Sequence, residues 1–505
     1  MGENNENPMT ENYLDILQRT IRENWDQPAL TDFYLTEDGM AQDTSRGNRY
    51  TYGEMYGEMM RLGELFRLLG LQKGDHIAIC GSNSANWAVA YLSIAAFQGV
   101  AVTVLHSQNI EDIASQIDFS DSVALFTDDD LWDELQSHNL PQVKHVISLS
   151  DWSILHGELI RENCERTTRE EEHRKQLTNS KLSVGIAPDD LAMICFTSGS
   201  SGVTKGVMLS IGNISATIYC VINNYTLLKN RNMAIFLPMA HLLSTIGEIL
   251  STILQGAKLY ICGQTQALEA YLKILKIVSP FEIVLPPIVL EKILYSSYIQ
   301  YFFEINKTLD YCIVGGAIVK NELAEKSIIN NIPFTVGYGL TETSALISII
   351  GSKQYKIGTC GKICETLTAR ISPASEILVR GENVMLGYYK NPEATAEKID
   401  KDGWLHTGDA GYMDEDGYLY VTGRIGQDMI VLPNGENIHP EDIENKINAL
   451  PEVQESIVIA RDGHLVAIVR LTDFSPNTPN ALKDIRHAIL RAINHSYRIT
   501  RSFIA

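Results

Sequence analysis

Hydrophobic and polar residues alternate along positions 10–150 in patterns that predict helices and short strands in turn. The segment RYTYGEMYGEMMRLGELFRLLG (49–70) carries apolar residues at helical spacing and ends at Gly70, and GDHIAIC (74–80) is a short β-rich run. Strands that alternate with helices favour parallel sheets covered by helices, so the pattern predicts α/β layers.

The stretch from Cys80 to Ile110 contains no charged residue and raises the question of a membrane span. Polar residues interrupt it well before ~20 continuous apolar residues accumulate, which argues against a span. We expect instead a buried helix at about 85–97, a stop at Gly99 and a buried strand at about 100–105.

Three further runs, SVALFTDD (122–129), HVISLS (145–150) and LAMICFT (191–197), have the composition of short strands. Residues 158–176 instead pack charges of both signs at helical spacing, which is typical of a solvated surface helix.

The pattern changes after about residue 424, where a small α+β unit begins. It contains a turn at Asn434–Gly435 and a hairpin that turns at Asp462–Gly463. We therefore expect an α/β protein with a large N-terminal domain of layered sheets and flanking helices (1–424). A hinge joins it to a small α+β C-terminal domain (425–505).

The chain has 505 residues, with 62 acidic against 41 basic residues and a formal net charge of −21. That balance excludes nucleic acid and anionic membranes as the main partner, because both select for basic surface. The eight cysteines are scattered without a CxxC pair, and no two histidines lie three to five residues apart, so no zinc site is predicted. The first residues show no secretory leader, and we expect a cytoplasmic protein with reduced cysteines and no integral membrane segment.

The sharpest local feature is TSGSSGVTKG (197–206), a glycine- and hydroxyl-rich loop that follows an apolar strand. Glycines let backbone N–H groups approach a polyphosphate, hydroxyls add donors, and Lys205 supplies positive charge. The loop is not a Walker A motif, since Thr204 stands where glycine is required. It is not a GxSxG nucleophile elbow either, since Val203 replaces the last glycine.

This loop closely resembles the signature loop of the adenylate-forming superfamily, which contains acyl-CoA synthetases, adenylation domains of nonribosomal peptide synthesis and firefly-type luciferases. Other blocks of that family follow in order, and in pattern the chain is most similar to long-chain fatty-acid–CoA ligases. The blocks are LPMAHLLSTIGE (237–248), VGGA (314–317), VGYGLTET (336–343), EILVRGENVMLGYYKNPEAT (376–395), GWLHTGDAGYMDEDGYLYVTGR (403–424) and NGENIHPEDIE (434–444).

The resemblance implies a reaction in two halves that uses ATP, Mg²⁺ and coenzyme A. A carboxylate attacks the α-phosphate of ATP to give an acyl-adenylate and pyrophosphate, and a thiol then displaces AMP. The residues that the resemblance assigns to the β- and γ-phosphates are Thr197, Ser198, Gly199, Ser200, Ser201, Gly202, Thr204 and Lys205.

The resemblance also makes Glu342 the magnesium ligand, which suits a hard cation that prefers carboxylate oxygen, and brings Thr341 to the α-phosphate. Asp409 matches the ligand of the ribose hydroxyls, and Arg424 matches a second contact to ribose and phosphate. The expected catalytic residues are therefore Lys205, Thr341, Glu342 and Arg424. The resemblance further implies that the adenine is contacted by Gly315, Gly316, Ala317, Gly337, Tyr338 and Gly339, and we expect Tyr338 to stack on the base.

His241 matches the residue that gates the acyl pocket in this family. Amino-acid-activating relatives place an aspartate just after it to bind the substrate ammonium, whereas Leu242 stands here. The absence of a counter-charge at this position points to a carboxylic acid with an apolar tail.

Two features depart from the family pattern. The hinge position two residues after Arg424 is Gly426, where relatives usually carry Asp or Lys, and glycine leaves a rotation feasible. The catalytic lysine of a PxTxxGK-like motif is missing, since the sequence ends at HSYRITRSFIA. We expect either that the C-terminal domain lacks its last segment in the sequence as given, or that the protein adenylates poorly while still binding ATP.

The leading hypothesis is an AMP-forming acyl-CoA synthetase for a fatty or other apolar carboxylic acid. One alternative is a ligase of the same superfamily that uses an acyl carrier protein or activates an aryl acid. Another is a degenerate adenylate-binding protein without turnover, and a luciferase-like side activity is a remote fourth.

Overall fold

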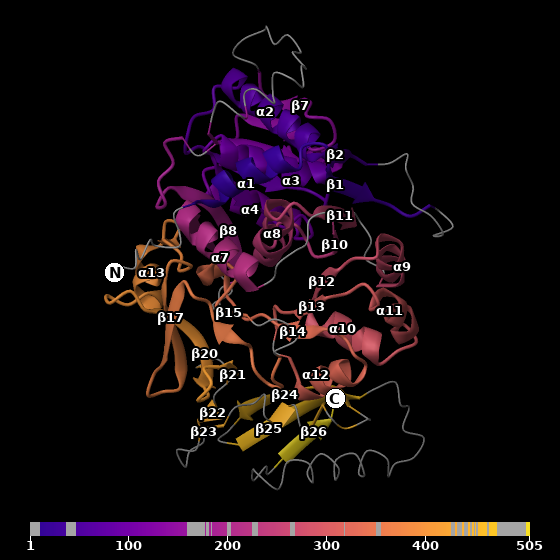
Figure 1. Cartoon of the computed structure of the whole chain (residues 1–505). Coiled ribbons are helices and arrows are strands. Elements are labelled where there is room, and N and C mark those ends of the chain that lie inside the picture. Colours follow the sequence, from indigo (N-terminus) through magenta and orange to yellow (C-terminus); the bar gives the residue numbers. More distant parts are fainter. Residues whose placement is uncertain are drawn as a thin grey trace, which may run out of the picture. The chain divides into compact units, whose positions relative to one another are not determined.

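The protein is described here from a computed structural model, whose elements are labelled in Figure 1. Contacts within the chain define two units. The first comprises Met1–Arg370, Leu378–His406 and Met413–Tyr420, and the second comprises Ile371–Ile377, Thr407–Tyr412 and Val421–Ala505. The structure describes residues 11–36, 47–158, 177, 181–182, 184–198, 204–224, 231–262, 268–317, 319–349, 355–425, 430–431, 437–438, 443–444, 447–448, 450, 453–461, 464–471 and 501–504.

The first unit contains an eight-stranded sheet, made in chain order of β3 (His76–Cys80), β4 (Val100–Thr103), β5 (Ala124–Thr127), β6 (His145–Ser148), β7 (Ile154–His156), β8 (Leu191–Ser198), β9 (Thr204–Ser210) and β19 (Gly387–Tyr388). The strand order is β19-β9-β8-β4-β3-β5-β6-β7. The strands from β8 to β6 pair in parallel, while β7, β9 and β19 join the two edges antiparallel. This arrangement confirms the predicted α/β layers, and the three predicted strands are β5, β6 and β8.

Helices bury the parallel strands of this sheet. α3 (Ala85–Ala96) is buried along almost its whole length, which confirms the helix predicted for the uncharged stretch. Its end differs in one detail, because the residue with a left-handed backbone is Gln98 (φ 65°) rather than Gly99. The helix predicted to stop at Gly70 is α2 (Tyr52–Leu68), and Gly70 has the left-handed φ of 73° that favours glycine.

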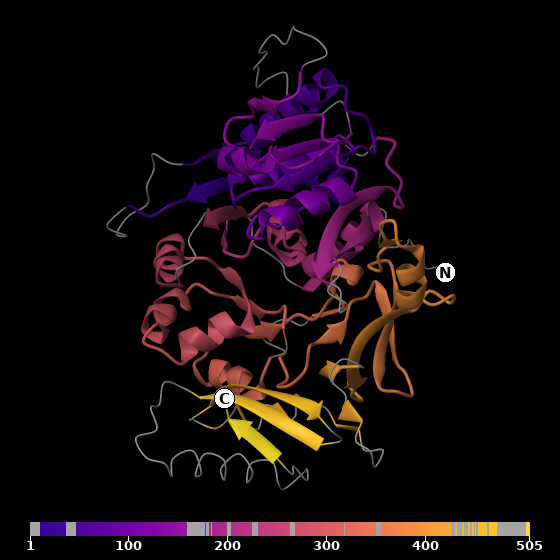
Figure 2. The same ribbon diagram turned by 180° about the vertical axis from the view of Figure 1, so that it is seen from behind.

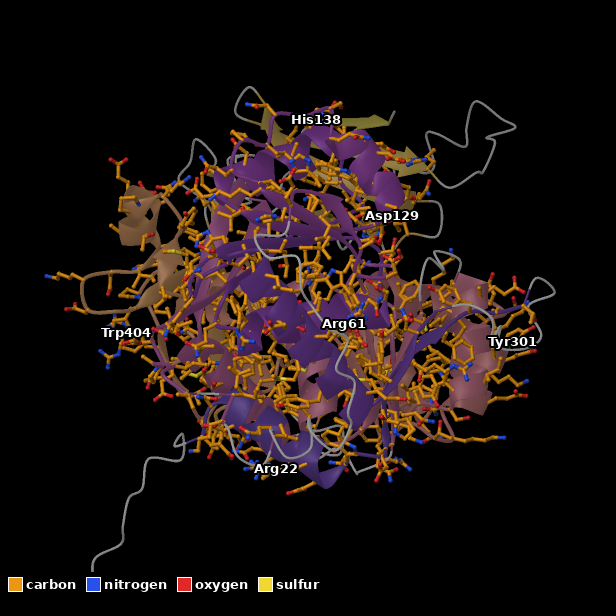
Figure 3. All side chains as sticks on the ribbon, turned by 90° about the horizontal axis from the view of Figure 1, so that it is seen from above. Arg22, Arg61, Asp129, His138, Tyr301 and Trp404 are labelled. Carbon is orange, nitrogen blue, oxygen red and sulfur yellow. The ribbon has the colours of Figure 1, made fainter. Side chains whose placement is uncertain are left out.

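A seven-stranded sheet also belongs to the first unit and is made of β1 (Pro28–Phe33), β2 (Arg49–Thr51), β10 (Asn232–Ile235), β11 (Lys258–Cys262), β12 (Glu282–Leu285), β13 (Tyr311–Val314) and β14 (Phe334–Val336). Its order is β14-β13-β12-β10-β11-β1-β2, and all neighbours except β1 and β2 pair in parallel. The helices that pack beside β12–β14 in Figures 1 and 2 are α9 (Leu268–Val278), α10 (Pro287–Leu294), α11 (Ile299–Ile305) and α12 (Asn321–Ile329). Tyr301 of α11 lies at the outer edge of this layer (Figure 3) and is 40% exposed.

Further helices of the first unit are α1 (Tyr13–Glu23), α4 (Ile110–Phe119), α5 (Asp129–Leu135), α7 (Ile211–Asn224), the π-helix η1 (Leu243–Leu250), α8 (Ser251–Leu254), the 3₁₀ turn η2 (Thr341–Thr343) and α13 (Pro392–Lys398). Within the described ranges, no helix has the length and apolar character that crossing a bilayer requires. The predicted surface helix at 158–176 lies outside the described residues apart from its first position.

A two-stranded sheet pairs β15 (Ser348–Ile349) with β16 (Lys362–Ile363). A four-stranded sheet contains, in spatial order, β17 (Leu367–Ile371), β18 (Glu376–Gly381), β20 (Leu405–Met413) and β21 (Leu419–Arg424). In the second unit, β22 (Ile430–Val431) pairs with β23 (Asn437–Ile438). A three-stranded sheet there contains β24 (Val453–Arg461), β25 (His464–Leu471) and β26 (Arg501–Ile504). Arg461 pairs with His464 across the antiparallel β24 and β25, which confirms the predicted hairpin.

Two carboxyl groups lie inside the first unit. Glu248 of η1 is fully buried and makes no hydrogen bond of normal geometry with the described residues, and Glu282 of β12 is only 3% exposed. Burial raises the pKa of each to about 8, with the charge of Glu282 adding to the shift of Glu248 and the nearby Ser244 hydroxyl opposing it. Both groups are therefore predominantly protonated at neutral pH in the folded protein.

We expect the stability of the protein to fall as pH rises through this window. An unfolded glutamate titrates near 4.5, so between about pH 4.5 and 8 the folded chain holds protons that the unfolded chain has lost. Above that window, a Glu248→Gln variant should melt at least ~2 °C higher than the wild type. At pH 5 the two should melt alike. Thermal unfolding from pH 5 to pH 9 measures this, with exposed Glu415→Gln as control, and a Glu248→Gln curve parallel to wild type would contradict the expectation.

Candidate active site

The glycine-rich loop joins two paired strands. β8 and β9 are antiparallel, and at their ends Thr197 pairs with Lys205 and Ser198 with Thr204. The loop thus leaves an apolar buried strand, as the sequence predicts, and re-enters the sheet through an exposed Thr204 and a half-buried Lys205. The predicted phosphate contacts of its central residues, Gly199, Ser200, Ser201 and Gly202, lie outside the described residues.

Thr341 and Glu342 lie in the 3₁₀ turn η2, in a loop held under backbone strain. The two residues after it, Ser344 (φ 52°) and Ala345 (φ 78°), both have left-handed backbones, which non-glycine residues rarely adopt. Gly339 lies so close to this bend that a Cβ there would be 2.1 Å from the carbonyl oxygen of Ala345. The loop therefore has one closely defined path, which fixes where the Glu342 carboxylate can point.

Lys205 and Glu342 meet at a residue that the sequence did not single out, Tyr388 of β19. The Tyr388 hydroxyl donates a hydrogen bond of 2.7 Å to Oε1 of Glu342. The ammonium nitrogen of Lys205 lies 4.9 Å from the centre of the same ring. Tyr388 belongs to the block at 376–395 that carries part of the family resemblance, but position in a block does not show which side chains face the site.

The chemistry of Glu342 fits the magnesium ligand that the sequence predicts. In nucleotide sites Mg²⁺ is held by one or two carboxylates together with phosphate oxygens and waters. Among the described residues no group of three or more His, Cys, Asp and Glu side chains is placed to hold a metal by itself. The half-buried carboxylate of Glu342 could serve as the single protein ligand of a magnesium ion whose other ligands are phosphate oxygens and waters. Its role as magnesium ligand stays a prediction.

The predicted adenine contacts come from two neighbouring strand ends. β13 and β14 pair in parallel up to Val314 and Val336, so both following segments leave the sheet at the same edge. A Cβ on Gly315 would lie 3.2 Å from the carbonyl oxygen of Gly337, which shows how closely the segments approach. The structure thus brings the two groups of predicted residues together, namely Gly315, Gly316 and Ala317 with Gly337, Tyr338 and Gly339.

His241 and Leu242 lie at the start of η1. The side chain of His241 is exposed, although surrounding atoms displace enough water to lower its pKa below the ordinary value, while Leu242 is buried. The side-chain amide of Asn83 braces the segment before them by donating to Leu237 O (2.9 Å) and accepting from the Met239 N–H (2.8 Å). This brace holds the segment that leads from β10 to His241, and the gating role of His241 stays a prediction.

Asp409 and Arg424 lie in the second unit and form an ion pair, with Arg424 Nε 3.0 Å from Asp409 Oδ1. The Asp409 side chain is only 8% exposed, whereas that of Arg424 is 48% exposed. Gly408 precedes Asp409 with a φ of 78°, and its N–H donates to Oε1 of Glu376. The structure therefore brings these two predicted nucleotide contacts together, whereas the predicted hinge residue Gly426 lies outside the described residues.

Comparison with known proteins identifies related chains. The family model "AMP-binding enzyme" matches residues 17–389. The chain is 29% identical over 441 residues to 4-coumarate–CoA ligase-like 2 of Arabidopsis thaliana, covering 83% of this chain and 75% of that protein. It is 28% identical over 437 residues to 2-succinylbenzoate–CoA ligase of Oceanobacillus iheyensis, covering 84% of this chain and 83% of that protein.

The fold is also that of solved structures. Superposed on ATP-bound MatB from Rhodopseudomonas palustris, the chain has a TM-score of 0.78 at 20% sequence identity. The match covers 98% of this chain and 95% of that one. The predicted fold class is thereby confirmed over nearly the full length.

We expect a methyl group at Gly339 to displace the loop that carries Glu342. Gly339→Ala should abolish most of the thermal stabilisation that ATP with Mg²⁺ gives, because the new Cβ has no room beside Ala345. Gly63→Ala, in the middle of α2 with open space around it, should be neutral or stabilising by roughly 0.5–1 kcal/mol. Melting curves with and without ATP measure both, and equal ligand responses in the two variants would refute the close-packing argument.

Proposed function

The chain belongs to the AMP-binding enzyme family, and we propose that it converts an apolar carboxylic acid into its coenzyme A thioester with consumption of ATP. The substrate we favour is a fatty acid. As an enzyme it is an ATP-dependent acid–thiol ligase. The observation that carries the proposal is the meeting of Lys205 and Glu342 on one tyrosine, where the phosphate hairpin returns to the sheet.

The first half of the reaction forms a mixed anhydride. One oxygen of the substrate carboxylate attacks the α-phosphorus of ATP, the bond to the bridging oxygen breaks, and pyrophosphate leaves. Thr341 contacts the α-phosphate, and Lys205 with the hairpin amides and hydroxyls holds the β- and γ-phosphates. Mg²⁺ bound at Glu342 would neutralise charge on the triphosphate.

The second half transfers the acyl group. The thiol sulfur of coenzyme A attacks the acyl carbon, the thiol proton is lost to solvent or base, and AMP leaves with the electrons of the broken C–O bond. Asp409 accepts hydrogen bonds from the ribose hydroxyls, and Arg424 contacts ribose and phosphate. We further propose that residues 425–505 form a mobile domain that turns on Gly426 relative to the body of residues 1–424.

We infer that the acid is apolar from Leu242 and from the side chains of η1, the helix that follows His241. Leu242 stands where an ammonium-binding aspartate would be needed, and the one carboxyl group of η1, Glu248, is protonated at neutral pH because burial raises its pKa. No described residue of η1 therefore offers a negative charge to a substrate amine. Ile246, Ile249 and Leu250 complete a buried apolar helix, which suits a hydrocarbon tail.

The named alternatives differ in acid and in acceptor. The alternative acid is an aryl acid, and the alternative acceptor to coenzyme A is an acyl carrier protein.

The free thiols of the seven described cysteines support the predicted cytoplasmic location. A degenerate adenylate-binding protein would be stabilised by ATP without turnover.

We expect the full-length protein to catalyse ATP–pyrophosphate exchange with an apolar acid. The panel comprises short-, medium- and long-chain fatty acids, hydroxycinnamates and amino acids, and amino acids should give background rates. Glu342→Gln should lower exchange by about 10²-fold or more, because it removes the charge that holds the metal. Exposed Glu415→Gln serves as the control.

Thioester formation then separates the acceptors, with coenzyme A and holo acyl carrier protein offered at equal concentration. Exchange with aryl acids alone would replace the fatty-acid proposal by the aryl-acid alternative. Thermal stabilisation by ATP with background exchange for every acid would establish the degenerate alternative.

A further inference from the structure

Tyr388 occupies a position between two opposite charges that both serve the triphosphate. We infer that Tyr388 is a positioning residue of this site: its hydroxyl orients the Glu342 carboxylate for Mg²⁺, and its ring keeps Lys205 from pairing with that carboxylate. The inference rests on the proposed function for the roles of Glu342 and Lys205, and on the structure for the contacts.

The hydroxyl contact has a defined direction. An ionised carboxylate can only accept, so the 2.7 Å contact runs from the Tyr388 hydroxyl to Oε1 of Glu342. The Tyr388 hydroxyl is thus the donor and the Glu342 carboxylate the acceptor of this bond. A fixed donor on one oxygen sets the plane of the carboxylate and the direction of its other lone pairs, as outer partners do for metal ligands.

The ring contact explains why Lys205 stays available. Its ammonium nitrogen lies 4.9 Å from the ring centre, within the distance at which a cation is attracted to an aromatic face. No ion pair joins Lys205 to any described residue, although Glu342 touches the same tyrosine. The ring therefore satisfies the cation without neutralising it, and the charge remains for phosphate.

The backbone around Tyr388 is fixed on both sides. β19 pairs with β9, opposing Tyr388 to Val207, and the Tyr388 N–H donates to Thr395 Oγ1 at 2.9 Å. The next residue, Tyr389, donates its N–H to the carbonyl of Gly206 at 2.7 Å, immediately after Lys205. The tyrosine and the lysine are thus carried by adjacent, hydrogen-bonded strands, so their backbones cannot move apart independently.

The next two residues of the same segment, Tyr389 and Lys390, both bind the carboxylate of Asp121. Lys390 Nζ lies 2.8 Å from Oδ1 of Asp121, and the Tyr389 hydroxyl donates to its Oδ2 at 2.7 Å. These bonds join the segment to the loop after α4. Such anchoring on both sides is what a residue needs if it is to hold another group to a fraction of an ångström.

Binding of ATP with and without Mg²⁺ tests the inference, measured by titration calorimetry on the full chain. In the wild type Mg²⁺ should tighten ATP binding, and Tyr388→Phe, which keeps the ring, should lose about tenfold of that gain while metal-free ATP binds within twofold. Tyr388→Leu should in addition weaken metal-free ATP about tenfold, because Lys205 can then pair with Glu342. Tyr420→Phe removes a matched tyrosine–carboxylate bond, to Asp414 (3.2 Å), and should change neither value.

A cycle with Glu342→Gln distinguishes positioning from general destabilisation. If Tyr388 acts through Glu342, adding Tyr388→Phe to Glu342→Gln should cost less than twofold further in Mg²⁺-dependent binding. A wild-type magnesium gain in Tyr388→Phe, or fully additive losses in the double variant, would overturn the inference. Calorimetry measures ATP binding and requires no turnover. If no acid supported exchange, the proposed acid activation would be overturned, but the role of Tyr388 in Mg²⁺-dependent ATP binding would still be tested independently.

Discussion

The hydrogen bond from Tyr388 to Glu342 spans 46 residues of sequence and joins three parts of the first unit. One end lies in the strained turn after β14, the other in a two-residue strand that pairs with β9. β9 in turn carries Lys205 and closes the glycine-rich hairpin with β8. The relative positions of the β8–β9 pair, the Glu342 carboxylate and Lys205 are therefore set by one short contact and the sheet pairing behind it.

The strain around Glu342 persists because buried polar groups hold the bend. The hydroxyl of Ser344 donates to the carbonyl of Asn383 at 2.9 Å, and the Asn383 side-chain amide donates to Thr217 of α7 at 2.9 Å. All three residues are buried, so each broken bond would leave an unsatisfied polar group, at a cost of about 1–3 kcal/mol. This network compensates two consecutive left-handed residues, which would relax if the loop were free.

Sequence patterns were sufficient where local rules decide the outcome. The stop at Gly70, the buried helix before β4 and the strand that enters the glycine-rich loop follow from periodicity and from glycine's freedom, and the ordered motifs named the fold class. Tyr388 and the buried carboxyl of Glu248 could not be found this way. A tyrosine two residues after a leucine looks the same in sequence whether its ring faces solvent or a lysine from a distant strand. Likewise, a glutamate in an apolar helix gives no local sign that all its neighbours exclude water. Such facts depend on strand pairing between distant segments, which one chain's local pattern does not encode.

Net charge places a further demand on the site. A chain with a formal charge of −21 must bind ATP and coenzyme A, which are themselves polyanions. Salt screens charges beyond about 8 Å under physiological conditions, so the acidic surface at large matters less than the few charges within reach of the phosphates. In the proposed site, Lys205 attracts phosphate effectively only while no carboxylate of the protein neutralises it. An aromatic ring is a suitable neighbour for this purpose, because it attracts a cation without cancelling its charge and still lets phosphate approach from the other side. The hydroxyl of the same tyrosine is hydrogen-bonded to the Glu342 carboxylate, so in the proposed site one side chain keeps the carboxylate available for Mg²⁺ and the lysine available for phosphate.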